Sequence, residues 1–430
     1  MKNSYQQNLN GCLAKEIGAS GLTQDELGRY VKSTECILET LRRDFCANSV
    51  PFLTLPAEEE ISRVNEVAQS FRGRFSNVIV LGTGGSSLGG KTLCALAPKT
   101  AGPNIHFLDN IDPLTIDALV TTLDWVNTGI LAISKSGFTT ETLAQLAVFV
   151  DVLREHVNDT KISEHIAVVT DSSGSPLTEI ARNLGCVLLE HPRQIGGRYS
   201  VFSVSGILPA RIMGLDIGGV HAGASEILDL LNHSGSAEQF PPALGAATAV
   251  GLSQLKKLST SVFMTYSDRL SNLGLWYCQL WAESLGKDGK GITPVRATGT
   301  LDQHSQLQLY LAGPPDKMFS LILTDTAGEG PGVPDEFSTI NHLSYLKGRT
   351  IGDVFAASGN ATALTLTHAG RPTRIFKLLN VDERSIGALM MHLMIETVVV
   401  ANLISVDPYS QPAVEVGKEL VRQHLDQNAQ

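Results

Sequence analysis

Residues 80–96, VLGTGGSSLGGKTLCAL, contain two overlapping patterns that bind phosphate groups. The first is the nucleotide P-loop, G-x-x-x-x-G-K-[ST], in which backbone amides surround a phosphate and a lysine reaches the terminal phosphates. The second is a loop of glycine and serine that wraps around a sugar phosphate. The P-loop pattern uses Gly85, Gly90, Lys91 and Thr92, whereas the glycine-serine loop uses Gly82, Gly84, Gly85, Ser86 and Gly89.

The P-loop pattern begins too far from the strand that should precede it. A P-loop runs directly out of a buried strand. We expect that strand to end near Leu81, so residues 82–84 lie between the strand and the first glycine of the pattern and would displace the phosphate cradle. We therefore interpret Lys91 as an ordinary residue of the first helical turn. A dinucleotide-binding loop is incomplete too: Asp109 ends the next strand, but Ser87 stands where G-x-G-x-x-G has its third glycine.

A second candidate phosphate site is SKSGFTTET, residues 134–142, which follows the apolar run GILAIS. Hydroxyl groups and the free amides of a helix N-terminus form an anion site, and the helix dipole favours negative charge there. Serine and threonine also cap helices without binding any ligand. More hydroxyls gather here than one cap uses, so we favour the phosphate interpretation, with Ser134, Ser136, Thr139 and Thr140 around Lys135.

Residue types suited to proton transfer occur at separate places further along the chain. Arg198 follows two glycines, which let the backbone approach a ligand closely. Glu283 lies near the end of an apolar helix, and a carboxylate beside apolar side chains suits a general base. Single residues of these types are at least as often structural, so by themselves they leave both interpretations open. The further candidates are His304 in DQHSQLQ and, two helical turns apart in QPAVEVGK, Gln411 and Lys418.

The elements that must position these residues alternate along the chain. Short β-branched runs, each followed by a helix-like stretch, indicate parallel strands with helical crossovers. The rhythm stops in a glycine- and alanine-rich passage near residues 216–250 and then restarts, so we predict an α/β fold with two such units. The expected parts are an N-terminal helical arm over 1–50, a first domain with the phosphate cradle over 51–220, a second over 221–403, and a C-terminal helical tail with Lys418 over 404–430.

Composition excludes several classes of protein. A net charge of -10 argues against a sequence-independent grip on nucleic acid or on an anionic membrane. The six cysteines include no Cys-x-x-Cys pair, so neither a disulfide framework nor a metal site of zinc type is expected. The first residues lack the apolar core of a signal peptide, and we expect a cytoplasmic protein. The apolar stretch 386–406 carries His392, Glu396 and Asn402 and is predicted to be a buried core helix rather than a membrane span.

Taken together and in order, these segments resemble the phosphoglucose isomerase family in its shorter bacterial form. The resemblance spans about residues 80–418 and rests on GTGGSSLG, SKSGFTTET, GGRYS, WAESLGK, DQHSQLQ and QPAVEVGK. It implies two sugar-isomerase domains, each a parallel sheet sandwiched by helices. It also implies the reversible conversion of glucose 6-phosphate to fructose 6-phosphate without metal or cofactor.

The resemblance assigns roles to the candidate residues. Ser134, Lys135, Ser136 and Thr139 would bind the phosphate, Lys135 chiefly through its amide, while Gly85 and Ser86 would line the sugar. His304 and Lys418 would open the ring, and Glu283 would carry a proton between C2 and C1 through a cis-enediol. Arg198 would stabilise the negative charge on oxygen, and Gln411 would help to place the substrate. The family is dimeric, and its ring-opening histidine reaches the site from the partner subunit.

Three residues depart from the family pattern, namely Thr83, Phe138 and Ala413. Phe138 is expected to narrow the phosphate site and Ala413 to shift the helix with Lys418, but neither removes a group with a chemical role. Other functions stay open: an isomerase that also accepts mannose 6-phosphate, a sugar-phosphate-binding regulator without catalysis, and a nucleotide-dependent enzyme. Retention of Glu283, His304, Arg198 and Lys418 together argues against the regulator.

Overall fold

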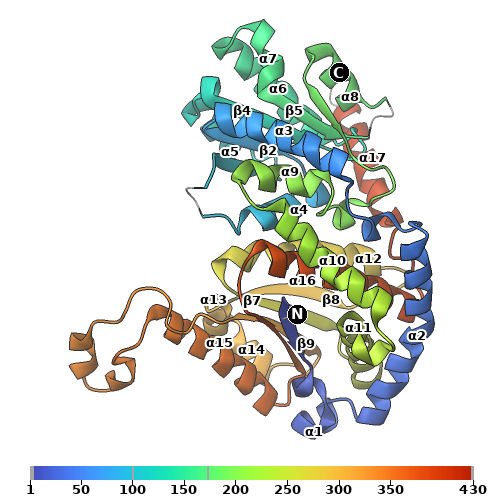
Figure 1. Ribbon diagram of the computed structural model, residues 1–430, viewed down its shortest axis with the longest axis vertical. Helices are drawn as coiled ribbons and strands as arrows, with labels where there is room; N and C mark the ends of the chain where they lie inside the picture. The colour runs from blue at the N-terminus through green and yellow to red at the C-terminus, as the bar shows by residue number, and fades with distance from the viewer. Residues whose placement is uncertain (1–3, 99–100, 172–173, 428–430) are drawn as a thin grey trace.

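The computed structural model describes residues 4–98, 101–171 and 174–427. Within these residues the strands form two five-stranded sheets, one in the upper and one in the lower half of Figure 1. Helices cover both sheets, as expected for apolar parallel strands that are buried on both faces. The predicted α/β fold with two helix-covered sheets is confirmed, whereas the exact domain boundaries stay a prediction.

The first sheet is parallel throughout, in the order β3-β2-β4-β5-β6. Its central strand β4 is buried along its whole length. Because β2 and β4 are neighbours and parallel, the loops that follow them leave the same edge of the sheet. The strands are β2 (Asn77–Leu81), β3 (Asn104–Leu108), β4 (Thr128–Ile133), β5 (Ile166–Thr170) and β6 (Val187–Glu190).

The second sheet has the order β1-β10-β9-β7-β8 and includes two strands, β1 and β8, that the sequence did not reveal. Four strands are parallel: β7 (Thr260–Tyr266), β8 (Thr293–Gly299), β9 (Lys317–Thr324) and β10 (Thr373–Leu378). The fifth, β1 (Tyr5–Asn8), pairs antiparallel with β10. The expected helical arm over 1–50 therefore begins with an edge strand, whose sequence, YQQN, is too short and too polar to show a strand period.

The helices lie on both faces of each sheet and between the two sheets. In the described residues α10, α12 and α16 occupy the space between the sheets (Figure 1), and α4 contacts α12 across that space. The helices are α1 (Ala14–Ile17), α2 (Gln24–Cys46), α3 (Glu58–Arg74), α4 (Leu88–Cys94), α5 (Pro113–Thr122), α6 (Thr140–His156), α7 (Asp159–His165), α8 (Pro176–Leu184), α9 (Val204–Met213), α10 (Ile217–His233), α11 (Pro241–Lys256), α12 (Ser271–Leu285), α13 (Leu301–Ser305), α14 (Leu307–Ala312), α15 (Ile351–His368), α16 (Glu383–Leu403) and α17 (Glu415–Gln427).

The helix α16 is long and apolar enough to span a bilayer, yet 89% of its most apolar window is buried inside the protein. Its two buried ionisable side chains have partners: Glu396 accepts hydrogen bonds from Arg374 at 2.7 and 2.9 Å and lies 2.8 Å from His392. His392 in turn contacts the Tyr5 hydroxyl of β1. Buried charges are tolerated when they are paired in this way, so the predicted buried core helix is confirmed.

Candidate active site

The glycine-rich loop after β2 packs directly on neighbouring segments. It begins with a short 3-10 helix, Gly84–Ser86. A Cβ atom on Gly85 would lie 2.2 Å from the carbonyl carbon of Gly197. Gly84 has a φ of +55°, and a Cβ atom there would lie 2.9 Å from Nε2 of Gln279 on α12. Only glycine permits both approaches, so the loop lies against the GGRYS segment and α12.

The Lys91 side chain is paired with Asp109, directly after β3, and is therefore not available to bind a phosphate. It lies in α4 and forms an ion pair with Asp109 over 2.7 Å. Thr92, the next residue of the P-loop pattern, donates its hydroxyl to main-chain carbonyls, one of them that of Asn272 at 3.1 Å. These contacts agree with the interpretation of Lys91 as an ordinary helix residue, and they leave the P-loop pattern without its phosphate-facing lysine.

The loop between β4 and α6 brings the predicted phosphate-binding hydroxyls together. The hydroxyl oxygens of Ser134 and Thr139 are 2.8 Å apart. The amide of Gly137 donates to Ser134 Oγ at 3.1 Å, and the amide of Phe138 donates to Ser136 Oγ at 3.2 Å. The loop is thus a closed turn of hydroxyls and amides at the N-terminus of α6, which is the arrangement that attracts an oxyanion.

Positive charges lie close to this turn. Burial lowers the pKa of Lys135; the charge of Arg198 lowers it further, and that of Asp171 raises it. The positive charge of Arg198 is therefore close enough to act on Lys135 in the hydroxyl cradle. The side chain of Phe138, one of the departures from the family pattern, is 49% exposed and does not lie buried in the turn.

The buried guanidinium of Arg198 lies at the centre of the candidate site. Its Nη1 is 3.2 Å from Oε2 of Glu283, and its Nε donates to Ser284 Oγ at 2.9 Å. Ser284 Oγ also lies 2.9 Å from the hydroxyl of Tyr199. Arg198 is completely buried, whereas the Glu283 side chain keeps 29% of its surface exposed. A carboxylate in this position is fixed on one side and open to a ligand on the other.

The same guanidinium holds the segment that leads to the C-terminal helix. Nη2 of Arg198 donates to the carbonyl oxygens of Pro408 at 2.6 Å and Ser410 at 3.1 Å, and Nη1 donates to the side-chain oxygen of Gln411. Arg198, Glu283 and Gln411, which are far apart in the sequence, therefore meet in space. Ala413 lies in an exposed 3-10 helix just beyond this point.

Gln279 belongs to this site and was missed in the sequence. Its Nε2 donates to Glu283 Oε1 at 3.0 Å, so both oxygens of the carboxylate have a donor. Its own Oε1 is buried and has no hydrogen-bond partner among the described residues. A buried acceptor of this kind is suited to the hydroxyl of a ligand. The sequence spacing could have revealed this residue, because Gln279 lies one helical turn before Glu283 and therefore on the same helix face.

Two predicted residues lie apart from this cluster in the single chain. His304 is exposed on α13, beyond β8 of the second sheet. Lys418 lies on α17, is 60% exposed and forms an ion pair with Glu415 over 2.7 Å. No hydrogen bond or ion pair within residues 4–98, 101–171 and 174–427 connects either side chain to Glu283 or Arg198.

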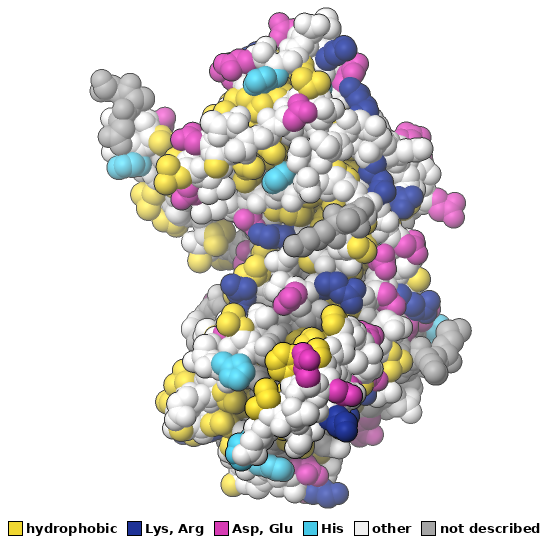
Figure 2. All heavy atoms as spheres, turned by 90° about the vertical axis from the view of Figure 1, so that its left-hand side faces the viewer, with side chains coloured by type: hydrophobic (Ala, Val, Ile, Leu, Met, Phe, Trp, Pro, Cys, Tyr) yellow, Lys and Arg dark blue, Asp and Glu magenta, His cyan; other side chains and the backbone are white. Residues whose placement is uncertain are grey.

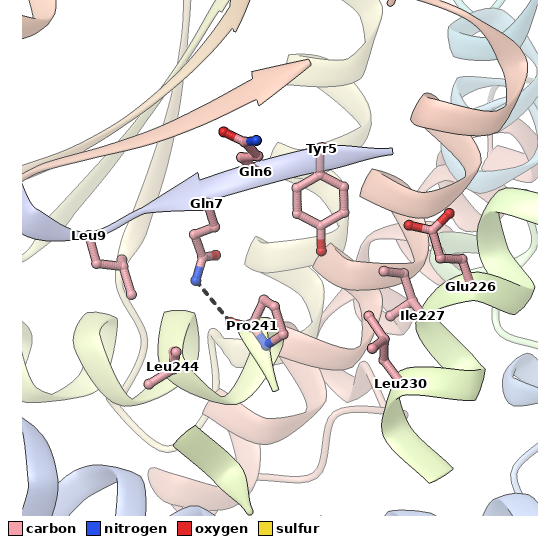
Figure 3. Close-up of a pocket in the computed structure, with 9 residues that line it drawn as sticks. All are labelled: Tyr5, Gln6, Gln7, Leu9, Glu226, Ile227, Leu230, Pro241 and Leu244. Atoms are coloured by element: carbon pink, nitrogen blue, oxygen red, sulfur yellow. Dashed lines mark hydrogen bonds between the residues drawn. The ribbon is translucent and has the colours of Figure 1, made fainter. Parts of the chain in front are cut away.

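One pocket of the described chain lies apart from this cluster. Figure 3 shows this pocket of about 420 Å³, where β1 meets α10 and α11. Most of its lining is apolar, and Gln7 spans it to donate to the carbonyl of Pro241 at 3.0 Å. The glycine loop and the hydroxyl cradle do not line it.

Comparison with known proteins gives consistent results. The family model described as phosphoglucose isomerase matches residues 60–307. The glucose-6-phosphate isomerase of Rubrobacter xylanophilus is 36% identical over 410 residues, which cover 93% of this chain and 94% of the relative. A glucose-6-phosphate isomerase of Thermus thermophilus is 35% identical over 400 residues, with 90% and 94% covered.

Solved structures agree with these sequence relatives. A hypothetical protein from Thermus thermophilus superposes with a TM-score of 0.84 at 32% identity, covering 98% of this chain and 99% of that one. A glucose-6-phosphate isomerase from Chlamydia trachomatis has a TM-score of 0.74 at 23% identity, covering 87% of this chain and 74% of that one. The second of these supports the fold alone.

Proposed function

Since this chain belongs to the phosphoglucose isomerase family, we infer that it catalyses the reversible isomerisation of glucose 6-phosphate and fructose 6-phosphate. The observation that carries this inference most directly is the environment of Glu283. Its carboxylate is partly exposed and is held by Arg198 and by Gln279, whose side chain lies against Gly84 of the glycine loop. An aldose-ketose isomerase needs one such group to move a proton between neighbouring carbon atoms.

The proposed binding mode uses the loops at the carboxyl ends of β2 and β4. The phosphate binds at the hydroxyl cradle of the second loop, and the sugar lies along Gly85 and Ser86 of the first. Ligands of open α/β sheets bind outside the carboxyl ends of the strands. The substrate-binding residues are Gly85, Ser86, Ser134, Lys135, Ser136, Thr139 and Gln411.

The proposed chemistry has two stages. His304 and Lys418 first help the sugar ring to open. Glu283 then removes the proton from C2 and returns it to C1, so that a cis-enediol forms between the two transfers. The developing charge on oxygen is stabilised by the fixed positive charge of Arg198 beside the carboxylate. One carboxylate takes and returns the same proton, so the mechanism requires neither a metal ion nor an organic cofactor.

The active form in this proposal is a cytoplasmic homodimer in which His304 serves the partner's site. His304 is too exposed on α13 to be part of the buried cluster of its own chain. Large apolar side chains are exposed on α13 and α14 near it, namely Leu301 and Leu309, and the exposed Tyr345 lines one hollow with its neighbour Gln303. Exposed apolar patches of this kind are typical of protein–protein contacts.

The second copy would cover the face that Figure 2 presents. The segment between β9 and α15 projects from the body there (Figure 1), and hydrophobic side chains are exposed on both halves of the face (Figure 2). Tyr345, on this segment, also lines a hollow of about 660 Å³ against α15. This dimer makes each site depend on both chains.

Conversion of fructose 6-phosphate to glucose 6-phosphate, followed through a coupled dehydrogenase, tests the proposed function. The assay is run without nucleotide, in the presence of a chelator. Rapid turnover is the expected result. Absence of turnover in a folded, dimeric preparation would contradict the isomerase assignment and favour a binding-only protein.

A further inference from the structure

At the C-terminus of α12, which carries Glu283, one lysine side chain bonds to two of the last main-chain carbonyls. The last four carbonyls of a helix have no partner within the helix. Here backbone amides of the next residues satisfy those of Ala282 and Leu285 at 2.9 Å. The remaining two, on Glu283 and Ser284, both accept hydrogen bonds from Nζ of Lys287 at 2.8 Å.

We propose that Lys287 is a positioning residue for the reaction, because it holds the main chain of Glu283 and its neighbour in one place. This proposal rests on the proposed function of Glu283 as the proton carrier. Lys287 does not touch the carboxylate in the described contacts. It acts through the two peptide carbonyls, and so fixes the point from which the Glu283 side chain extends.

The rest of the site holds the side chains of the same two residues. Gln279 and Arg198 donate to the carboxylate of Glu283, while Arg198 donates to the hydroxyl of Ser284. Among the described residues, only Lys287 supplies side-chain donors to the two carbonyls. A helix end that frays would displace the carboxylate even with its side-chain partners intact, and a displacement of about 1 Å lowers a rate roughly a hundredfold.

The electrostatic setting supports a link between Lys287 and the site. Burial lowers the pKa of Lys287, and the charge of Arg198 lowers it further; the carboxylates of Asp407 and Glu283 act in the opposite direction. A cation at a helix C-terminus is stabilised by the carbonyl dipoles. The ammonium group therefore lies among the charges of the site rather than on a remote surface.

The test is the Lys287→Met variant, which keeps the aliphatic stem and removes the donors. We expect kcat to fall about ten- to a hundredfold with KM within about twofold, because substrate contacts remain. The kinetic isotope effect on kcat with glucose 6-phosphate deuterated at C2 should rise, since proton transfer becomes slower than the other steps. Lys287→Arg, which can also donate to two carbonyls, should recover most of kcat and keeps the test available if the methionine variant folds poorly.

Lys290 provides a matched control. Its Nζ donates to the carbonyls of Ile404 at 3.0 Å and Ser405 at 3.4 Å, so it bonds two consecutive carbonyls just beyond the end of α16, as Lys287 bonds two at the end of α12. We expect Lys290→Met to leave kcat and the isotope effect unchanged. Equal losses of kcat in the two variants, or an unchanged isotope effect in Lys287→Met, would reduce Lys287 to an ordinary structural cap and overturn the proposal.

Glu283→Gln, measured in the same assays, separates this proposal from the proposed function. If Glu283→Gln is inactive and Lys287→Met retains full kcat, the positioning role is wrong and the assignment of the base stands. If Glu283→Gln retains high activity, the assignment of the base itself fails.

Discussion

Nη1 of Arg198 and Oε2 of Glu283 lie 3.2 Å apart, in a pair whose guanidinium is fully buried and whose carboxylate is 29% exposed. The two partners therefore have different freedom. Arg198 is fixed by hydrogen bonds to two main-chain carbonyls and to Ser284. The carboxylate keeps an accessible side, so the pair presents a partly exposed negative group in front of a buried positive charge.

Replacement of Glu283 by glutamine should remove catalysis while preserving the fold. The amide is nearly isosteric but cannot accept the C2 proton, and loss of a general base lowers a rate by about 10²–10⁴. The measurement is solvent deuterium incorporation at C2 together with the coupled assay. Glu16→Gln, at an exposed position, serves as control. Substantial exchange by Glu283→Gln would place the base on another residue.

Replacement of Arg198 by lysine should lower both stability and activity, although the charge is retained. Lysine cannot supply the planar set of donors that now reaches the Pro408 and Ser410 carbonyls and Glu283. Buried acceptors without donors cost about 1–3 kcal/mol each, so the free energy of unfolding should fall by roughly 2–4 kcal/mol. Denaturant unfolding measures this loss, and limited proteolysis after residue 405 reports release of the C-terminal segment.

The control for that experiment is Arg193→Lys, because the Arg193 side chain is 67% exposed in its ion pair with Asp171. An exposed pair contributes about 1 kcal/mol or less. Equal effects of the two substitutions would contradict a central role for Arg198.

Two inactive variants should complement each other if His304 acts across the dimer. A mixed dimer of Glu283→Gln and His304→Gln chains has one site with both native residues. Random exchange makes about half of the dimers mixed, so activity should return to about a quarter of the native value. Mass spectrometry of isotope-labelled chains verifies the exchange. Verified mixing without recovery would place His304 in the site of its own chain.

Replacement of Lys91 by alanine should have little effect. Its ion pair with Asp109 is about one-quarter exposed on both sides, and such a pair contributes about 1 kcal/mol or less. We expect kcat/KM to stay within about twofold of the native value. ATP should not raise the melting temperature, whereas fructose 6-phosphate should. A large loss of activity in Lys91→Ala would restore the P-loop interpretation.

His191 should make stability fall in mildly acidic solution. Burial is the main cause that lowers its pKa from 6.5 to about 4, with Lys135 acting in the same direction and Asp171 in the opposite one. The unfolded chain therefore takes up this proton first as the pH falls. The stabilisation is complete above pH 6.5, is lost between about pH 6.5 and 4, and falls no further below.

Between pH 7 and pH 5, His191 alone should lower the free energy of unfolding by about 2 kcal/mol. Denaturant unfolding of His191→Asn at both pH values tests this, with the exposed His233→Asn as control. The difference between the two pH values should shrink in His191→Asn and persist in His233→Asn. The same pH dependence in native protein and His191→Asn would assign the acid sensitivity to carboxylates.

The sequence predicted best those elements whose hydrophobic pattern is local and whose side chains are buried. The apolar runs became the parallel strands of both sheets except β8, whose sequence TPVRATG is not an apolar run, and α16 is buried although its composition resembles a membrane span. The hydroxyls of Ser134 and Thr139 meet as the motif indicated. These features depend on residues that are close in sequence or on hydrophobicity alone.

Features that depend on distant pairing were not visible. The strand β1 has no pattern of its own and exists because β10 offers a free edge. The role of Gln279 follows from its contact with Glu283 and from the near approach of Gly84. In the proposed dimer His304 serves the partner's site, and no pattern within one chain reveals such a contact.

The pairing of β1 with β10 and the hold of Arg198 on Pro408 also set an order in time. During synthesis the ribosome releases the first sheet as a contiguous stretch, so that domain can fold while the rest is still being made. In the second sheet, β1 is made first but pairs with β10, so it stays unpaired until β10 has been made. The segment with Gln411 comes later still. A nascent chain therefore lacks the contact between Arg198 and Gln411 until almost all of the chain has been made.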